Sequence, residues 1–440
     1  MLKGLFAAGA SSALVVVPAV AAGSAVPRVA AKSQVTVFVA NLGSSTVTPI
    51  RAASGRALAA ITVGLSPGAM VVSPDGKTVY VAGNLPGMTP SAAAARPISA
   101  VTREAGKLIR GIGLFPRIMG VTPNGGTLYI GSCCQSIASG EVDVVSTATH
   151  RVRARLDAGT EPDGIAVTPD GKAVYVVSAV GGAFAPDNVY VTSVATNATR
   201  RLHVFGIPRT VAISPNGKAA YVASQVVNHP HGGIFPIRVA TTRKLAQIRV
   251  GLEPAAIGFT PSGARAYVVN EGRDTVTPIK VATGQPMTPI KVGAVPVAIA
   301  FAVTSAGTMA YVVNQGSDTV TPIKVATNQA LAPIKVGKQP VAIAVTPSGA
   351  TAYVVNEASG TVTPINTAAN RALAPIKVGQ AAGCDRHRPV TSQAADACRP
   401  VPSLARKRDR GGDRRAVSAP ECRDRVKLAP PAGRRSSAAR

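Results

Sequence analysis

From about residue 35 to residue 379 the chain repeats one pattern of apolar and polar positions. Each copy has an apolar run after a proline, as in residues 341–345, then a polar turn, and then an apolar run around a tyrosine. Two shorter runs follow, of the form Thr-Val-Thr-Pro-Ile and Ala-Pro-Ile-Lys-Val. Short apolar runs bounded by turn residues predict four β-strands in every copy.

The tyrosine marks each copy, and the spacing between copies falls from 49 to 42 residues along the chain. The marked positions are Tyr80, Tyr129, Tyr175, Tyr221, Tyr267, Tyr311 and Tyr353, with Phe38 in a partial copy before them. One four-stranded unit cannot bury both of its faces, but units packed radially can. The sequence therefore predicts an all-β fold, a closed β-propeller of seven or eight four-stranded antiparallel blades. Counting the three runs in residues 35–63 gives thirty-one strands, one short of eight blades.

Turn chemistry supports this division. The first two strands of a copy are joined by Ser/Thr-Pro-x-Gly, as in Ser73-Pro74-Asp75-Gly76, where proline presets φ and glycine takes the left-handed position. The third and fourth runs contain prolines, which a sheet tolerates where an amide is not needed in the ladder. We therefore expect these two strands toward the outer edge of each blade.

The copies resemble the YVTN-type β-propeller repeat family. The motifs that carry the resemblance are Tyr-Val-Val-Asn at residues 267–270, 311–314 and 353–356, with Thr-Pro-x-Gly upstream and Thr-Val-Thr-Pro-Ile downstream. The family is common in secreted and cell-surface proteins and is related in fold to seven-bladed lactonase-like propellers. The resemblance implies a fold rather than an activity, because one fold hosts many functions.

Both ends of the chain lie outside the repeat. Residues 1–31 are predicted to be a signal peptide and short leader, with Lys3 before an apolar run and small residues at a cleavage site. An uncleaved tether is the alternative. Residues 32–379 are assigned to the propeller, and residues 380–440 to a disordered basic tail. That tail is either a native appendage or the product of a reading-frame shift that removed the thirty-second strand. The predicted location is secreted or cell-surface.

The formal net charge is +27, but about a third of it lies in the tail, where 15 Lys or Arg face 6 Asp or Glu. Elsewhere lysines recur once per run, at Lys280, Lys291, Lys324, Lys335 and Lys377. We interpret them as edge residues that oppose sheet-to-sheet association. No aromatic residues interleave with them, so nucleic acid is not an expected partner.

Cysteines and histidines give weaker signals. Cys133 and Cys134 are adjacent and form either a strained vicinal disulfide or two separate loop thiols, and the other three cysteines lie in the tail. His229 and His231, with Asp187 as a further ligand, are a candidate metal site. A metal-free exposed loop is the favoured interpretation, so no metal and no cofactor are expected.

One set of positions predicts a binding site at the mouth of the central channel. The residue after the first-strand proline is Gly68, Arg117, Asp163, Arg209, Ala255, Val297 or Val341 in successive copies. Arg117, Asp163 and Arg209 thus come from three neighbouring blades, and two guanidinium groups beside a carboxylate could hold an anionic or carbonyl-bearing ligand. The alternative is an ion-pair cluster that satisfies only itself.

The loops between the second and third strands share this face and vary in length and composition, at residues 83–97, 131–140, 178–188 and 224–234. Binding specificity usually lies in such loops. No nucleophile elbow, phosphate loop or paired-carboxylate motif is present. We therefore predict a binding scaffold for a protein, cell-wall or small-molecule ligand, with a lactonase-like hydrolase at the channel as the alternative.

Overall fold

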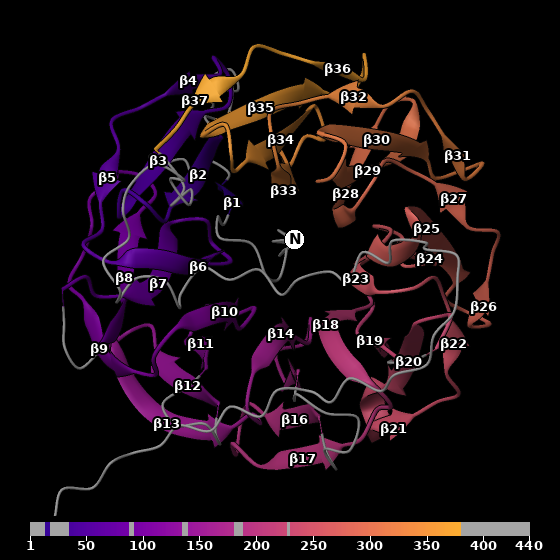
Figure 1. The fold of residues 1–440 in the computed structure, drawn as a ribbon. Coiled ribbons are helices and arrows are strands. Elements are labelled where there is room, and N and C mark those ends of the chain that lie inside the picture. Colours follow the sequence, from indigo (N-terminus) through magenta and orange to yellow (C-terminus); the bar gives the residue numbers. More distant parts are fainter. Residues whose placement is uncertain are drawn as a thin grey trace, which may run out of the picture. The chain divides into compact units, whose positions relative to one another are not determined.

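The computed structural model describes residues 14–17, 35–87, 92–133, 140–179, 188–226 and 229–379, and of residues 14–17 only the backbone. These residues belong to one compact unit, Met1–Gly383. They form eight antiparallel sheets arranged around a central axis, an eight-bladed β-propeller (Figure 1). The predicted all-β fold is confirmed, and the blade number is eight.

The first five blades contain 22 strands and one 3-10 turn. Blade 1 consists of β1 (Leu14–Val17), β2 (Thr36–Asn41), β3 (Thr46–Arg51), β4 (Arg56–Ala57) and β5 (Ile61–Thr62). Blade 2 consists of β6 (Ser66–Val72), β7 (Thr78–Asn84), β8 (Ala93–Ser99) and β9 (Ile109–Ile112). Blade 3 consists of β10 (Pro116–Val121), β11 (Thr127–Ser132), β12 (Glu141–Ser146) and β13 (Arg151–Asp157). Blade 4 consists of β14 (Pro162–Val167), β15 (Ala173–Ser178), β16 (Val189–Ser193) and β17 (Thr199–Leu202). Blade 5 consists of β18 (Ile207–Ile213), β19 (Ala219–Gln225), β20 (Gly233–Arg238), η1 (Val239–Thr241), β21 (Arg243–Lys244) and β22 (Ile248–Arg249).

The last three blades follow the most regular copies of the repeat. Blade 6 consists of β23 (Pro254–Phe259), β24 (Arg265–Asn270), η2 (Glu271–Arg273), β25 (Thr275–Lys280), β26 (Gln285–Pro286) and β27 (Ile290–Lys291). Blade 7 consists of β28 (Pro296–Thr304), β29 (Gly307–Asn314), β30 (Thr319–Lys324), β31 (Gln329–Ala330) and β32 (Ile334–Lys335). Blade 8 consists of β33 (Pro340–Val345), β34 (Thr351–Asn356), β35 (Thr361–Asn366), β36 (Arg371–Ala372) and β37 (Ile376–Lys377). No described residue lies in an α-helix, and so no helix in this part of the chain has the length and apolarity to cross a bilayer.

The outer strand of five blades is split into two short pieces, and each of these blades has a proline in its third strand. In blade 7 both β31 and β32 pair with β30, and Pro333 lies in the break between them. Pro322 lies inside β30 opposite Tyr311, and its carbonyl accepts a hydrogen bond of 2.8 Å from Leu331 N in the same break. Since N–H and C=O of one residue point the same way in an antiparallel strand, the missing proline amide faces that break. The third strand is therefore interior, and only the fourth lies at the outer edge of the blade (Figure 1).

The tight turn between the first two strands has the predicted chemistry. In blade 2, Gly76 has φ of 71° and its N–H donates to the carbonyl of Ser73 at 2.8 Å. The Ser73 hydroxyl donates to Asp75 at 2.6 Å and accepts from Thr78 N at 2.9 Å. These side-chain bonds satisfy the polar groups of the turn and rigidify the face of the propeller that carries it.

The apolar core lies between blades rather than within them. Eight clusters of buried residues occur in the described part of the chain, one for each pair of adjacent blades. One cluster packs Val37, Val39 and Ile50 of blade 1 against Tyr353 and Val355 of blade 8. The Tyr353 hydroxyl also donates to the carbonyl of Ala52 at 3.2 Å. Contacts between the two ends of the repeat therefore close the ring.

The innermost strand of blade 1 comes from the segment predicted to be a leader. β1 pairs antiparallel with β2, with Leu14 opposite Val39 and Val17 opposite Thr36. The sequence prediction left this position for a strand after Gly379, and residues 380–440 lie outside the described residues. Removal of the leader, and the origin of the tail, stay predictions.

Candidate functional site

A β-bulge in the first strand positions the predicted site residues. In blades 2 to 8 the register shifts between the first-strand proline and the residue two positions later. The residue between them is left out of the ladder, and these residues are Gly68, Arg117, Asp163, Arg209, Ala255, Val297 and Val341. Bulges re-aim a side chain and recur next to binding sites. The residue after the first-strand proline therefore has the same bulged position in all seven of these blades.

Arg117, Asp163 and Arg209 lie close together, as the spacing predicted. Arg117 Nη1 is 3.8 Å from Asp163 Oδ1, and Arg209 Nη1 is 3.7 Å from Asp163 Oδ2. Both contacts are long for a charge-assisted hydrogen bond, whose usual length is about 2.7–2.9 Å. The arginine side chains are 49% and 54% exposed, whereas that of Asp163 is 17% exposed. The two arginine side chains are thus about half exposed, while the carboxylate between them is largely covered.

Further carboxylates extend this cluster along neighbouring blades. Burial raises the pKa of Asp163, Arg117 and Arg209 lower it, and Glu161 raises it. Burial also raises the pKa of Glu271, as does Glu253, while Arg209 lowers it. Cations and carboxylates therefore alternate from blade 3 to blade 6, an arrangement we call the channel arc. It comprises Arg117, Glu161, Asp163, Arg209, Glu253 and Glu271.

These glutamates do not occupy the position after the proline, so the prediction from the sequence did not include them. Glu161 and Glu253 directly precede Pro162 and Pro254, so the same alignment read one position earlier finds both. Glu271 follows Tyr-Val-Val-Asn, where the next two copies have Gln315 and Glu357. Its coupling to Arg209 of the preceding blade depends on how blades pack, which a linear pattern does not encode.

Exposed aromatic residues lie at the same end of the blades as the channel arc. Phe115 directly precedes Pro116 and is 43% exposed, and Phe205 precedes β18 and is 49% exposed. Large apolar side chains are exposed at only five described positions, so two of these five belong to connections that lead into first strands. The bulged residues of blades 6 to 8 differ, because they are the apolar Ala255, Val297 and Val341.

The variable loops on this face are only partly described. Residues 88–91, 134–139, 180–187 and 227–228 lie outside the described residues, and so do Cys134 and Asp187. The vicinal disulfide and the three-ligand metal site are therefore untested. Cys133 is buried, and the rings of His229 and His231 are 5.7 Å apart. Within the described residues no group of three or more metal-ligating side chains occurs.

A buried carboxylate in blade 3 was also missed. Asp143 is fully buried in β12, accepts a hydrogen bond of 2.7 Å from Gly113 N, and lies 3.1 Å from Arg155 Nε. Burial raises its pKa to about 6, against the opposing effects of Gly113 and Arg155. In blade 7 the equivalent residue is Thr321, whose hydroxyl accepts from Gly293 N at 3.4 Å. Asp143 therefore holds the loop between blades, a structural role that aligning the third strands reveals.

The protein is an eight-bladed β-propeller with a charged arc at one side of its channel. No family model matches the chain, and no curated protein matches its sequence. Among solved structures it is similar to hydrazine synthase of Kuenenia stuttgartiensis, at 22% identity and a TM-score of 0.54, over 70% of this chain and 96% of that chain. It is also similar to the dihydro-heme d1 dehydrogenase NirN in complex with DHE, at 15% identity and a TM-score of 0.63, over 84% of this chain and 79% of that chain. Both are β-propeller proteins, and likeness at this identity shows the fold alone.

Proposed function

We propose that this chain is a secreted or cell-surface binding propeller of the YVTN repeat type, and that its ligand contacts Arg117, Asp163 and Arg209. The proposed location follows from the leader predicted at residues 1–31. The repeat type follows from the Tyr-Val-Val-Asn motifs. The proposed site rests on the geometry of the three side chains.

The observation that carries the proposal is the mismatch in exposure between the charged partners. Both guanidinium groups are about half exposed and meet the carboxylate only at 3.7–3.8 Å. A cluster that served only to neutralise itself would be expected to form short, closed pairs. Here the carboxylate holds the two cations in place while leaving N–H donors free for an incoming group.

A ligand with a carboxylate or carbonyl oxygen fits this arrangement best. Two guanidinium groups can donate several hydrogen bonds to such an oxygen, and hydrogen bonds to charged groups are worth about 1.5–3 kcal/mol each. The exposed rings of Phe115 and Phe205 offer apolar surface at the same end of the blades. The nearby carboxylates Glu253 and Glu271 disfavour a ligand of high negative charge.

The test compares two variants that lose the same charge. Arg117→Ala/Arg209→Ala removes the proposed donors, and Lys280→Ala/Lys324→Ala removes two exposed lysines from the third strands of blades 6 and 7. Purified cell-wall material is used in pull-downs, and a panel of small carboxylates and amides is screened by native mass spectrometry. We expect binding to weaken at least about tenfold in the arginine variant only. Equal binding by both variants would contradict the proposed site.

The hydrolase alternative is tested by measuring lactone hydrolysis by the unaltered chain and its arginine variants. The carboxyl pKa of Asp163 and of Glu271 is raised by burial beside Arg209, and such groups can act as general acids. Hydrolysis of a lactone panel that disappears in both Arg117→Ala and Arg209→Ala would establish the hydrolase. Binding without turnover supports the scaffold.

A further inference from the structure

A pocket of about 480 Å³ lies between blades 5 and 6 and shares no lining residue with the channel arc. Its lining residues are Pro230, His231, Arg249, Val250, Gly251, Arg273, Thr275, Thr277, Pro286, Met287 and Pro289. They come from the end of the second-to-third-strand loop of blade 5, the outer strand of blade 5, and η2, β25 and the outer-strand break of blade 6. The volume lies in the range of small-molecule sites, roughly 300–1,000 Å³.

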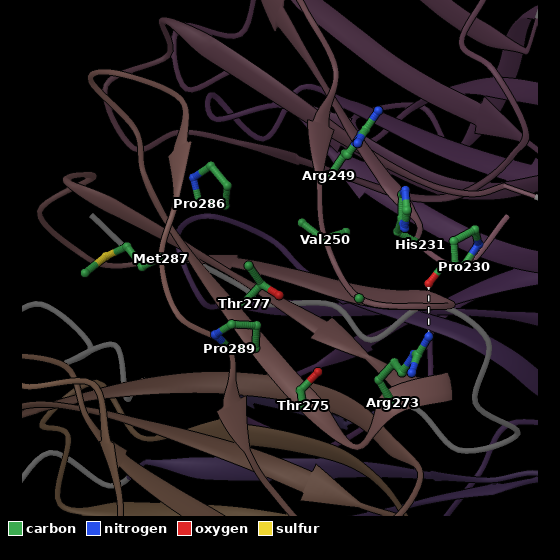
Figure 2. Close-up of a pocket in the computed structure, with 11 residues that line it drawn as sticks. Pro230, His231, Arg249, Val250, Arg273, Thr275, Thr277, Pro286, Met287 and Pro289 are labelled. Carbon is green, nitrogen blue, oxygen red and sulfur yellow. Dashed lines mark hydrogen bonds between the residues drawn. The ribbon is translucent and has the colours of Figure 1, made fainter.

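The lining is divided by polarity. Figure 2 shows Arg249, His231 and Arg273 on one side of the pocket and Pro286, Met287 and Pro289 on the other, with Thr277 between them. No carboxylate is among the described residues that line the pocket. Arg249 is exposed and has no hydrogen bond or ion pair to any described residue, so its donors are available. The pocket therefore offers hydrogen-bond donors at one end and hydrocarbon surface at the other.

Backbone contacts hold the cationic side in place. Gly232 N donates to the carbonyl of Gly251 at 2.8 Å, and Val250 N donates to the carbonyl of Gly232 at 3.2 Å. Across the interface, Arg273 Nη2 donates to the carbonyl of Pro230 at 3.3 Å, the dashed line in Figure 2. That bond orients Arg273 and uses one of its five N–H groups. A site fixed in this way loses little entropy when a ligand binds.

The same position between other blades lacks this set of groups. Between blades 6 and 7, Lys291 replaces Arg249, Ser317 replaces Arg273, and Ala330 replaces Pro286. Between blades 7 and 8, Lys335 and Ser359 occupy the two arginine positions. Since the strands themselves are nearly identical in these blades, the two arginines and the extra proline are not required by the fold. Neither of the next two interfaces has them.

We propose that the pocket between blades 5 and 6 binds a small carboxylate with an apolar chain or ring. Arg249 and Arg273 hold the carboxylate, His231 donates a further hydrogen bond, and the body of the ligand lies on Pro286, Met287 and Pro289. A carboxylate matches the planar guanidinium donors, and the absence of acidic lining residues leaves its charge unopposed. The pocket and the channel arc share no residue, so each can be altered without substituting a residue of the other.

The test uses 4-phenylbutyrate, with 4-phenylbutanol and 4-phenylbutylamine as probes of the same body and a different head group. Calorimetry and ligand-observed NMR are expected to show saturable binding of the carboxylate and much weaker binding of the alcohol and the amine. Arg249→Gln/Arg273→Gln should weaken 4-phenylbutyrate at least about tenfold. Arg249→Gln alone should weaken it severalfold, and it removes no hydrogen bond to a described residue, so the fold is preserved.

The matched control is Lys291→Gln/Lys335→Gln, which removes one cation from each of the next two interfaces. Its affinity for 4-phenylbutyrate should equal that of the unaltered chain. The proposal is overturned by absence of saturable binding at millimolar concentration. It is also overturned by equal binding of the alcohol, or by an equal loss of affinity in the lysine control.

Discussion

Blades 6 to 8 and blades 3 and 4 share one backbone plan but use their buried polar groups differently. In the regular blades an asparagine at the end of the second strand donates to two threonines of the third strand. The clearest of these bonds are Asn270 to Thr277, Asn314 to Thr321 and Asn356 to Thr363, each at 2.9 Å. In blades 3 and 4 the asparagine is replaced by Ser132 or Ser178, and in blade 3 the threonine is replaced by Asp143.

The tyrosines differ in the same way. In the regular blades the hydroxyl reaches the next blade, where Tyr267 donates to Asn328 Oδ1 at 2.6 Å and Tyr311 to Asn370 Oδ1 at 2.7 Å. In blades 3 and 4 the buried hydroxyls of Tyr129 and Tyr175 have no partner among the described residues. The regular blades thus use repeated polar contacts to hold their neighbours. In blades 3 and 4 these repeated contacts are replaced by contacts particular to each blade. The same two blades carry Arg117 and Asp163.

The largest loss of stability is expected for Arg155→Met in blade 3. It leaves the buried Asp143 carboxylate with the Gly113 N–H and without its cation. We expect a loss of about 2–3 kcal/mol at pH 8, below the 3–5 kcal/mol of a fully buried pair because Arg155 is 48% exposed. Urea unfolding measures it, with Arg153→Met on the same strand as the control. A loss in Arg153→Met as large as in Arg155→Met would refute the role of Asp143.

The pH dependence of Asp143 gives the next largest effect. Its folded pKa of about 6 lies above the ordinary 3.8, so the folded state binds the proton more tightly and stability falls as pH rises through 6. At about 1.4 kcal/mol for each unit between the two pKa values, the loss from pH 4.5 to 7.5 is on the order of 2 kcal/mol. Unfolding of the unaltered chain and of Asp143→Asn is compared at both values. A constant difference between the two proteins would exclude this titration.

Removing single tyrosine hydroxyls sharpens the contrast between the two regions. Tyr267→Phe and Tyr311→Phe each lose an inter-blade hydrogen bond, for an expected cost of about 1 kcal/mol. Tyr129→Phe and Tyr175→Phe remove a buried hydroxyl that has no described partner, so they should be neutral or slightly stabilising. The free energy of unfolding of each variant, from urea unfolding, measures these costs. Equal costs in all four variants would show that the regions do not differ.

The smallest effect is expected for an exposed ion pair in the regular region. Lys338 Nζ lies 2.7 Å from Asp318 Oδ2, but Lys338 is 76% exposed. Lys338→Ala should therefore cost less than about 0.5 kcal/mol, although the distance is shorter than that between Arg155 and Asp143. Thermal unfolding at low and high salt measures this cost. A loss comparable to that of Arg155→Met would show that burial does not control the strength of these pairs.

The sequence predicted the features that recur in every copy. The tyrosine spacing located the blades, the Ser73-type turn defined the joint between first and second strands, and the residue after the proline identified Asp163 with its two arginines. Contacts between non-equivalent positions of neighbouring copies were not predicted. Glu271 couples to Arg209 of the preceding blade, and the Arg249–Arg273 pocket joins two blades. Neither relation has a fixed separation along the chain that a repeat alignment could recognise.

The split of the outer strand was also missed, because the run Ala-Pro-Ile-Lys-Val reads as one strand. The third-strand proline beside it, such as Pro322, lacks the amide that would pair with the middle of this run, so the ladder is interrupted there. The role of residues 14–17 was missed for a different reason. A short run of Leu and Val suits a leader and an inner strand equally well, so composition does not separate the two.

Because β1 lies in the predicted leader, cleavage of that leader would remove the strand that pairs with β2. If the leader is cut away during secretion, the four residues that pair with Thr36–Val39 leave with it, and β2 is left with an open edge facing the axis. An open edge can pair with a strand from the same chain or from another copy of it. Cleavage of the leader would then leave the innermost strand position of blade 1 empty. The strand that pairs with β2 there would determine whether the molecule is a monomer.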